Sequence, residues 1–147
     1  MDPGTATAVV SLALQIPPTI QSITEFLRTI KEVPDELTTL IETMDQMQAN
    51  VNQVRGLMEQ QFSEARLAGS PMLLLNALKA CERNIKALGL LVEQVKDGLG
   101  AKNVKKRAWT NMSIQSKKAR LRELESHLRA AMSNLDSAVL YTSWQLQ

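Results

Sequence analysis

The sequence has few of the residues from which disulfide frameworks, metal centres and aromatic pockets are built. Its 147 residues include one cysteine and one histidine, so neither a disulfide framework nor a Cys/His zinc cluster can be assembled within the chain. Five aromatic residues leave little material for base stacking or for an aromatic ligand pocket. The first residues do not predict a secretory signal, because Asp2 stands where a basic region would be. This composition predicts a cytosolic protein that uses no cofactor and is not an enzyme.

The chain does have enough apolar material for one core. Hydrophobic residues make up 44% of the sequence and charged residues 22%, which is typical of one soluble globular domain, here residues 1–147. A compact fold of this length buries about two-thirds of the surface that the unfolded chain exposes. The acidic residues are scattered and no Glu-x-x-His motif occurs, so a di-metal site in a bundle core is not expected either.

Apolar residues recur in steps of three and four along four segments, and no strand-like alternation persists. This spacing predicts an all-α, up-and-down bundle of four long helices joined by short loops. A short extra helix before the last one, around residues 102–112, is left open. The apolar stripes run from Val9 to Ile30, from Leu37 to Phe62, from Leu74 to Leu99 and from Leu121 to Val139.

Prolines mark two of the predicted helix starts. Pro34 opens the second helix and Pro71 the third, since the missing amide of proline is harmless in the first turn. The link from Ile30 to Pro34 is so short that the first two helices must be antiparallel neighbours. Leu73 and Leu91 widen the third stripe, which predicts that the third helix is the most deeply buried.

The beginning of the chain carries no charge over residues 3–24, a length sufficient to cross a bilayer. Pro17 and Pro18 interrupt this run. A proline inside a helix lacks the amide donor and clashes with the preceding turn. The sequence therefore predicts a short uncharged arm, about residues 5–16, hinged to a helix of about 18–31.

Two interpretations of the arm stay open. The first is an ordinary bundle helix whose small residues let its neighbours pack closely. The second is a releasable membrane-active segment, because a helix without charge on any side is unusual where one face meets water. The residues that would carry the membrane activity are Val9, Val10, Leu12, Ala13, Leu14 and Ile16.

Charge is distributed unevenly along the chain. Residues 1–66 hold 4 Lys/Arg and 9 Asp/Glu, a net charge of −5, whereas residues 67–147 hold 13 and 6, a net charge of +7. A basic connector, residues 102–113, either contacts anionic lipid or is a solvated loop. It is short and has no recognition motif, so nucleic acid is not an expected partner. The predicted lipid-facing patch consists of Lys102, Lys105, Lys106, Arg107 and Trp109.

Several soft patterns follow one another along nearly the whole chain. Met1-Asp2-Pro3 precedes a small, uncharged helix, and residues 30–37 form a short turn with a proline that opens the next helix. Cys81-Glu82 lies among spaced leucines, and Trp109 follows the basic connector before the leucines of the last helix. In this order the patterns resemble the HeLo-like N-terminal domain of fungal signal-transducing NTPases (NLR-like) and related cell-death proteins.

The resemblance implies an N-terminal effector or signalling domain for programmed cell death or an innate-immunity-like response. Such a domain self-associates, and its N-terminal helix targets and permeabilises a membrane. A C-terminal sensor or NTPase module of the same longer chain would control it. The implied localisation is cytoplasmic, with recruitment to the plasma membrane on activation. The alternative is a non-enzymatic adaptor bundle that binds proteins and has neither membrane activity nor a small-molecule substrate.

Overall fold

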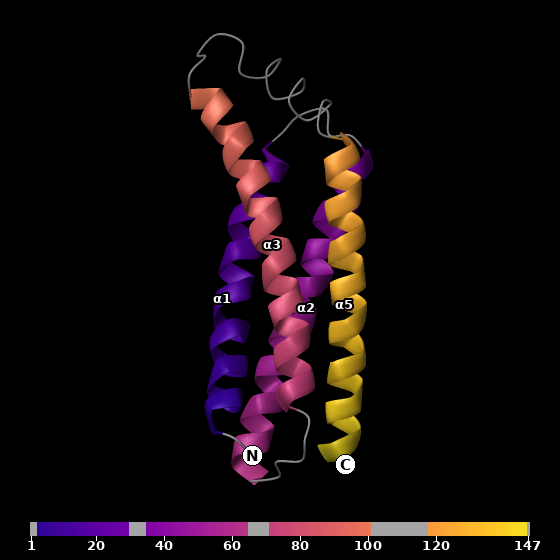
Figure 1. Cartoon of the computed structure of the whole chain (residues 1–147). Coiled ribbons are helices and arrows are strands. Elements are labelled where there is room, and N and C mark those ends of the chain that lie inside the picture. The colour runs from indigo at the N-terminus through magenta and orange to yellow at the C-terminus, as the bar shows by residue number, and fades with distance from the viewer. Residues whose placement is uncertain (1–2, 30–34, 65–70, 101–117, 147) are drawn as a thin grey trace.

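The computed structural model describes residues 3–29, 35–64, 71–100 and 118–146, which form four long helices (Figure 1). No strand occurs in these residues, and the predicted all-α bundle is confirmed. The short helix that the sequence leaves open around residues 102–112 lies outside the described residues. The helices are α1 (Pro3–Arg28), α2 (Asp35–Glu64), α3 (Pro71–Gly100) and α5 (Lys118–Leu146).

The helices alternate in direction, so the starts of α1 and α3 and the end of α5 lie at the same end of the bundle (Figure 1). Extensive packing joins α1 to α2 and α3, and joins α5 to the same two helices. The order around the bundle is therefore α1, α2, α5, α3. As the short link predicts, α1 and α2 are antiparallel neighbours. Although α2 and α3 follow one another in the chain, they lie diagonally opposite each other.

Each helix directs one aliphatic stripe into a common core, as the apolar spacing predicts. Three methionines of α2, Met44, Met47 and Met58, are at most 1% exposed and fill the core between branched aliphatic side chains. The other buried apolar residues are Ala6, Val9, Ala13, Ile16, Ile20, Ile23 and Leu27 of α1, Leu37, Leu40, Val51 and Val54 of α2, Leu74, Leu75, Ala77, Leu78, Cys81, Ile85, Leu88 and Val92 of α3, and Leu121, Leu124, Leu128, Ala131, Leu135, Ala138 and Val139 of α5.

The proline pair does not break the first helix. α1 is helical from Pro3 to Arg28, through Pro17 and Pro18. The predicted hinge between an arm of residues 5–16 and a helix of residues 18–31 is therefore wrong.

Burial on both sides of the prolines explains why the helix continues. Ile16 and Ile20 are at most 2% exposed and Pro17 is buried, so α2 and α3 cover the helix both before and after the pair. Tertiary packing outweighs the local preference here. The carbonyls of Ala13 and Leu14 still lose the amide donors that would stand four residues further on.

The described part of α3 buries eight apolar side chains, one more than each of the other described helices, in agreement with the expectation that α3 is the most deeply buried helix. Like the others, it packs extensively against only two neighbours, so some of its apolar side chains still face outward. Leu73 is 46% exposed and Leu90 is 68% exposed. The apolar face of α3 is wider than its two neighbours can cover.

We predict that Pro18→Ala stabilises the protein. Pro18 is exposed, so removal of its ring leaves no core cavity, and an alanine amide would supply the donor that the Leu14 carbonyl lacks. The free energy of unfolding should rise by up to about 3 kcal/mol, as measured by urea denaturation. Pro71→Ala is the control, because Pro71 begins α3, where a missing amide does no harm. Equal effects of the two substitutions would contradict this explanation.

Candidate functional site

The six α1 residues predicted to be membrane-active do not share one face of the helix. Half of them belong to the core. The resting bundle therefore covers much of the apolar surface that would contact lipid if the helix inserted. Val9, Ala13 and Ile16 are at most 2% exposed, Val10 and Leu12 are partly buried against the core, and Leu14 is 51% exposed.

By length and composition, α1 is apolar enough to cross a membrane. Its 26 residues span about 39 Å at a rise of ~1.5 Å per residue, against a hydrocarbon core of about 30 Å. The first charged residue within the helix is Glu25. Core helices of soluble proteins can have the same length and composition.

The predicted lipid-facing basic patch and the whole connector, residues 102–113, lie outside the described residues. The residues of the patch are Lys102, Lys105, Lys106, Arg107 and Trp109. The structure does place the two points to which this connector is attached, the end of α3 and the start of α5. Both points lie at the end of the bundle opposite to the start of α1 (Figure 1).

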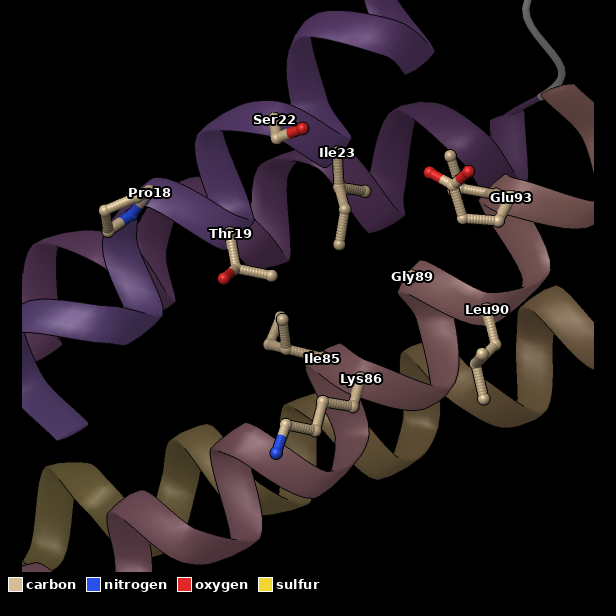
Figure 2. Close-up of a pocket in the computed structure, with 10 residues that line it drawn as sticks. Pro18, Thr19, Ser22, Ile23, Ile85, Lys86, Gly89, Leu90 and Glu93 are labelled. Carbon is tan, nitrogen blue, oxygen red and sulfur yellow. The ribbon is translucent and has the colours of Figure 1, made fainter.

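A groove of about 580 Å³ separates α1 from α3 directly after the proline pair (Figure 2). Thr19 and Ile23 of α1 project toward Ile85 of α3 across this groove. Gly89 forms part of the α3 side, where an added Cβ would lie 3.8 Å from Ile23 Cδ1, an ordinary van der Waals separation. The interface between α1 and α3 is therefore incompletely filled at this level.

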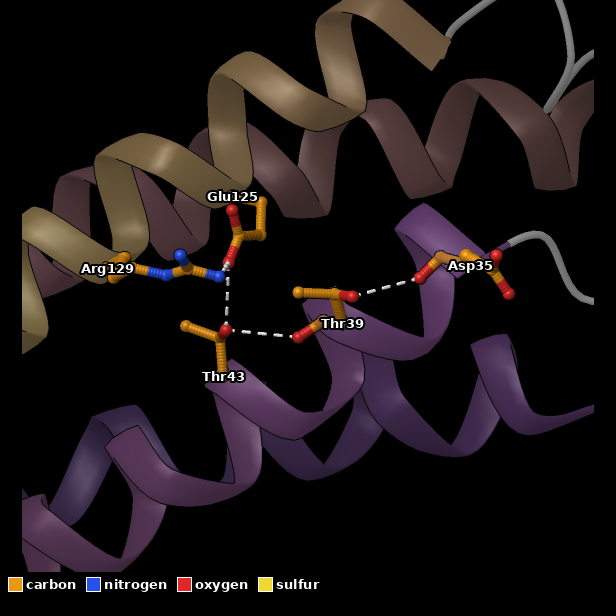
Figure 3. A network of polar contacts seen from close by, with 5 residues as sticks. All are labelled: Asp35, Thr39, Thr43, Glu125 and Arg129. Atoms are coloured by element: carbon orange, nitrogen blue, oxygen red, sulfur yellow. Dashed lines mark hydrogen bonds and ion pairs between the residues drawn. The ribbon is translucent and has the colours of Figure 1, made fainter.

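A buried threonine links α2 to α5 (Figure 3). Thr43 is 5% exposed, and its hydroxyl lies 3.0 Å from the Thr39 carbonyl oxygen and 3.1 Å from Glu125 Oε1. A hydroxyl has one proton, so Thr43 donates to one of these acceptors at a time or shares the proton between them. Arg129 Nη2 lies 2.5 Å from the same Glu125 oxygen. The charge on Glu125 is thus balanced at the edge of the interface.

Further polar contacts tie α2 to both of its neighbours. Asn50 donates its side-chain amide to Asp136 of α5. Arg28 at the end of α1 pairs with Asp45 at 2.6 Å, and both side chains are about half exposed. Exposed ion pairs of this kind contribute at most about 1 kcal/mol, so this pair positions the end of α1 more than it stabilises it.

Cys81 is a buried member of the core, in the apolar stripe of α3. Its Sγ lies 3.8 Å from the Ala131 carbonyl oxygen of α5, and Asn84 donates to the His127 carbonyl at 3.5 Å on the same interface. Burial raises the pKa of the Cys81 thiol from 9.0 to about 12, with a further contribution from the negative charge of Asp136. The site favours the neutral thiol and disfavours a nucleophilic thiolate.

Within the part of the chain that the structure describes, no three His, Cys, Asp or Glu side chains come together in a way that could hold a metal ion. Comparison of the chain with family models, with curated proteins and with solved structures finds no match. The resemblance to the HeLo-like domain therefore stays a prediction that rests on the sequence pattern.

The apolar spacing does not reveal an exposed cluster, here called the end cluster, where α3 starts and α5 ends. The only signals in the sequence are the width of the third stripe and the apolar last turns of the chain. Spacing identifies residues that share a face, but it does not say whether another helix covers that face. The end cluster consists of Met72, Leu73, Leu140, Tyr141 and Trp144, each between 46% and 65% exposed.

We predict that Gly89→Ala raises the free energy of unfolding by more than Gly56→Ala does. Both changes replace glycine inside a helix, which stabilises by about 1 kcal/mol. At Gly56 nothing lies within 4 Å of the added methyl group, whereas at Gly89 the methyl group would also contact Ile23 across the groove. Urea denaturation of the two variants isolates this contact. A smaller gain at Gly89 would mean that the groove does not accept the methyl group.

We predict that iodoacetamide alkylates Cys81 slowly in the folded protein. At pH 8 a thiol with a pKa of about 12 has a thiolate fraction about 1000-fold smaller than a thiol with a pKa of 9.0, and burial restricts access further. Mass spectrometry of the native and urea-unfolded protein measures both rates. Equal rates would show that Cys81 is accessible in the native bundle.

The same shift makes stability depend on alkaline pH. The unfolded thiol ionises near pH 9.0, while the folded thiol keeps its proton up to about pH 12. The stabilising contribution is therefore fully present below pH 9 and is lost as the pH rises toward 12. Cys81→Ala should lack this component in urea denaturation across the same range. An identical pH profile for the variant would contradict the assignment.

Proposed function

We propose that this chain is a self-associating effector domain, of the kind found in fungal cell-death and innate-immunity-like proteins, which permeabilises membranes through α1. The observation that carries the proposal is the lack of charge on every side of α1 from Pro3 to Thr24. The solvent face of a bundle helix is ordinarily charged. In α1 that face includes Leu14 and Pro18, so no ionised side chain has to be desolvated when this part of the helix enters lipid.

The resting bundle opposes release of α1. The helix buries seven apolar side chains at 5% exposure or less, and together these represent roughly 10 kcal/mol or more of burial. That is comparable to the whole stability of an ordinary domain, about 5–15 kcal/mol. Clustering of several copies at an anionic membrane would compensate for this loss of burial. It favours the conformation with released α1 if the assembly and the lipid bury α1 better than the bundle does.

Release is easier before the proline pair than after it. The buried side chains before the pair are smaller on average, since Ala6 and Ala13 are among them, whereas those after it are Ile20, Ile23 and Leu27. Two backbone hydrogen bonds are also missing at the junction. Residues 3–16 form about 21 Å of helix, too short to span a bilayer, so this mechanism begins with insertion at the membrane surface.

Complete burial of the inner stripe of α1 favours a second candidate function, the adaptor that binds proteins. In this alternative α1 is a permanent part of the core, and the groove between α1 and α3 persists. The two candidates differ in the hydrogen exchange of α1 amides with vesicles present. In the effector, the amides of residues 3–16 change their exchange rates when vesicles are added, because this segment leaves the bundle for lipid. In the adaptor, these amides exchange as they do in the free bundle.

We predict that the full chain fused to an oligomerising tag releases dye from vesicles, more from anionic than from neutral ones, and that Leu14→Glu lowers the release about 100-fold. The expected factor follows from the penalty of about 2.5–3.5 kcal/mol for a charge at the centre of an inserted helix. Leu14 is 51% exposed, so the substitution leaves the core intact. Leu12→Glu combined with Leu14→Glu should abolish release.

Leu90→Glu is the matched control, because Leu90 is 68% exposed but belongs to α3. It should release dye as the unchanged chain does. Circular dichroism establishes that each variant is helical. If the folded Leu14→Glu variant permeabilised vesicles as well as the control, α1 would not be the active segment. If no variant released dye under any condition, the adaptor function would be favoured.

A further inference from the structure

Exposed apolar side chains gather at one end of the bundle. Of the seven large hydrophobic residues that are exposed in the described part of the chain, five form the end cluster. Because α3 and α5 are antiparallel neighbours, the start of one lies beside the end of the other (Figure 1). Single exposed apolar residues are ordinary on any protein surface, whereas a gathered group marks an interaction site.

The end cluster protrudes more than it lines a cleft. A groove of about 580 Å³ runs between α3 and α5, and Leu73 and Tyr141 line it. Met72, Leu140 and Trp144 lie outside its lining, although each is more than half exposed. A helical ligand would be held by side chains on both walls of a groove. Side chains that project beyond the groove fit a broad, deformable surface better.

Charges of both signs lie near the end cluster, and the cations are on α3. Lys79 and Arg83 are exposed on the first half of α3, and Arg83 lines the same groove. The carboxylate of Asp136 accepts a hydrogen bond from Asn50 and is thereby directed toward α2. Glu82 of α3 pairs with a lysine one turn further along its own helix. α3 therefore presents two exposed cations within about three turns of Leu73, and Arg83 shares the groove with Leu73 and Tyr141.

We propose that the end cluster docks the bundle onto an anionic lipid surface. Trp and Tyr favour the membrane interface because their rings are apolar with one polar atom, which fits Trp144 and Tyr141. Lys79 and Arg83 then meet lipid phosphates and carboxylates. Docking at this end brings the uncharged start of α1 to the same surface. The inference takes one element from the proposed function, namely that the target is a membrane. Docking through the end cluster does not require α1 to insert.

The test measures co-sedimentation of the full chain with vesicles of phosphatidylcholine and phosphatidylserine, and with vesicles of phosphatidylcholine alone. Leu140→Ser combined with Trp144→Ser should weaken binding to the anionic vesicles about 10-fold or more. Leu90→Ser is the control, since Leu90 is 68% exposed, more than Leu140 at 54%, and lies outside the end cluster; this variant should bind as the unchanged chain does. Lys79→Gln combined with Arg83→Gln should weaken binding about 30-fold on anionic vesicles.

Fluorescence gives a second readout. In a Trp109→Phe background Trp144 is the remaining tryptophan, and its emission should shift to shorter wavelength on anionic vesicles. No binding to either vesicle, or equal binding of the end-cluster variant and the Leu90 control, would overturn the inference. So would a dimer in vesicle-free buffer that only the end-cluster variant loses. If binding depends on the end cluster but no dye is released, docking is supported and permeabilisation is refuted. If dye is released but the end-cluster variant binds as well as the unchanged chain, permeabilisation is supported and docking is refuted.

Discussion

Burial of one aliphatic stripe per helix, shared between two neighbours, is the constraint on which the rest of the bundle depends. The single cysteine cannot form a disulfide within the chain, so apolar burial has to supply most of the stability. Two neighbours cover one stripe, and whatever apolar surface lies beyond it meets water. α3 exceeds this limit on its outer face, and α1 meets water with an uncharged face. The membrane proposals concern these two surfaces.

Polar contacts occur between the helices that become neighbours. Four similar apolar stripes do not by themselves decide whether α3 lies beside α2 or across from it. The contacts Thr43–Glu125 and Asn50–Asp136 occur only when α2 and α5 are adjacent, and Asn84 reaches a carbonyl of α5 on the other side. The contacts of Asn50 and Asn84 with α5 are exposed, and Thr43 and Asn84 also bond to carbonyls of their own helices, so each contact adds about 1 kcal/mol to the observed order. The larger contribution comes from the apolar side chains that the neighbouring helices bury.

The sequence predicts most of the fold because three-four spacing directly encodes a buried face. It predicts the antiparallel first pair and the start of α3 at Pro71. It fails at Pro17 and Pro18, where local backbone chemistry favours a break and packing on both sides overrides it. It also fails for Leu73, since an apolar position on a helix is the same in sequence whether a neighbour covers it or not. The diagonal order depends on contacts between residues about 80 positions apart, which periodicity does not contain.

The diagonal placement of α1 and α5 determines what a bundle without its first helix would be. α5 touches both α2 and α3, so these three helices would remain joined in a row with α5 in the middle. The row would carry a trough one helix wide, lined by the stripes of α2 and α3. The first helix of a neighbouring molecule matches this trough in length and in pattern. Exchange of first helices between molecules would thus link copies into a chain without any surface that the single bundle does not already contain.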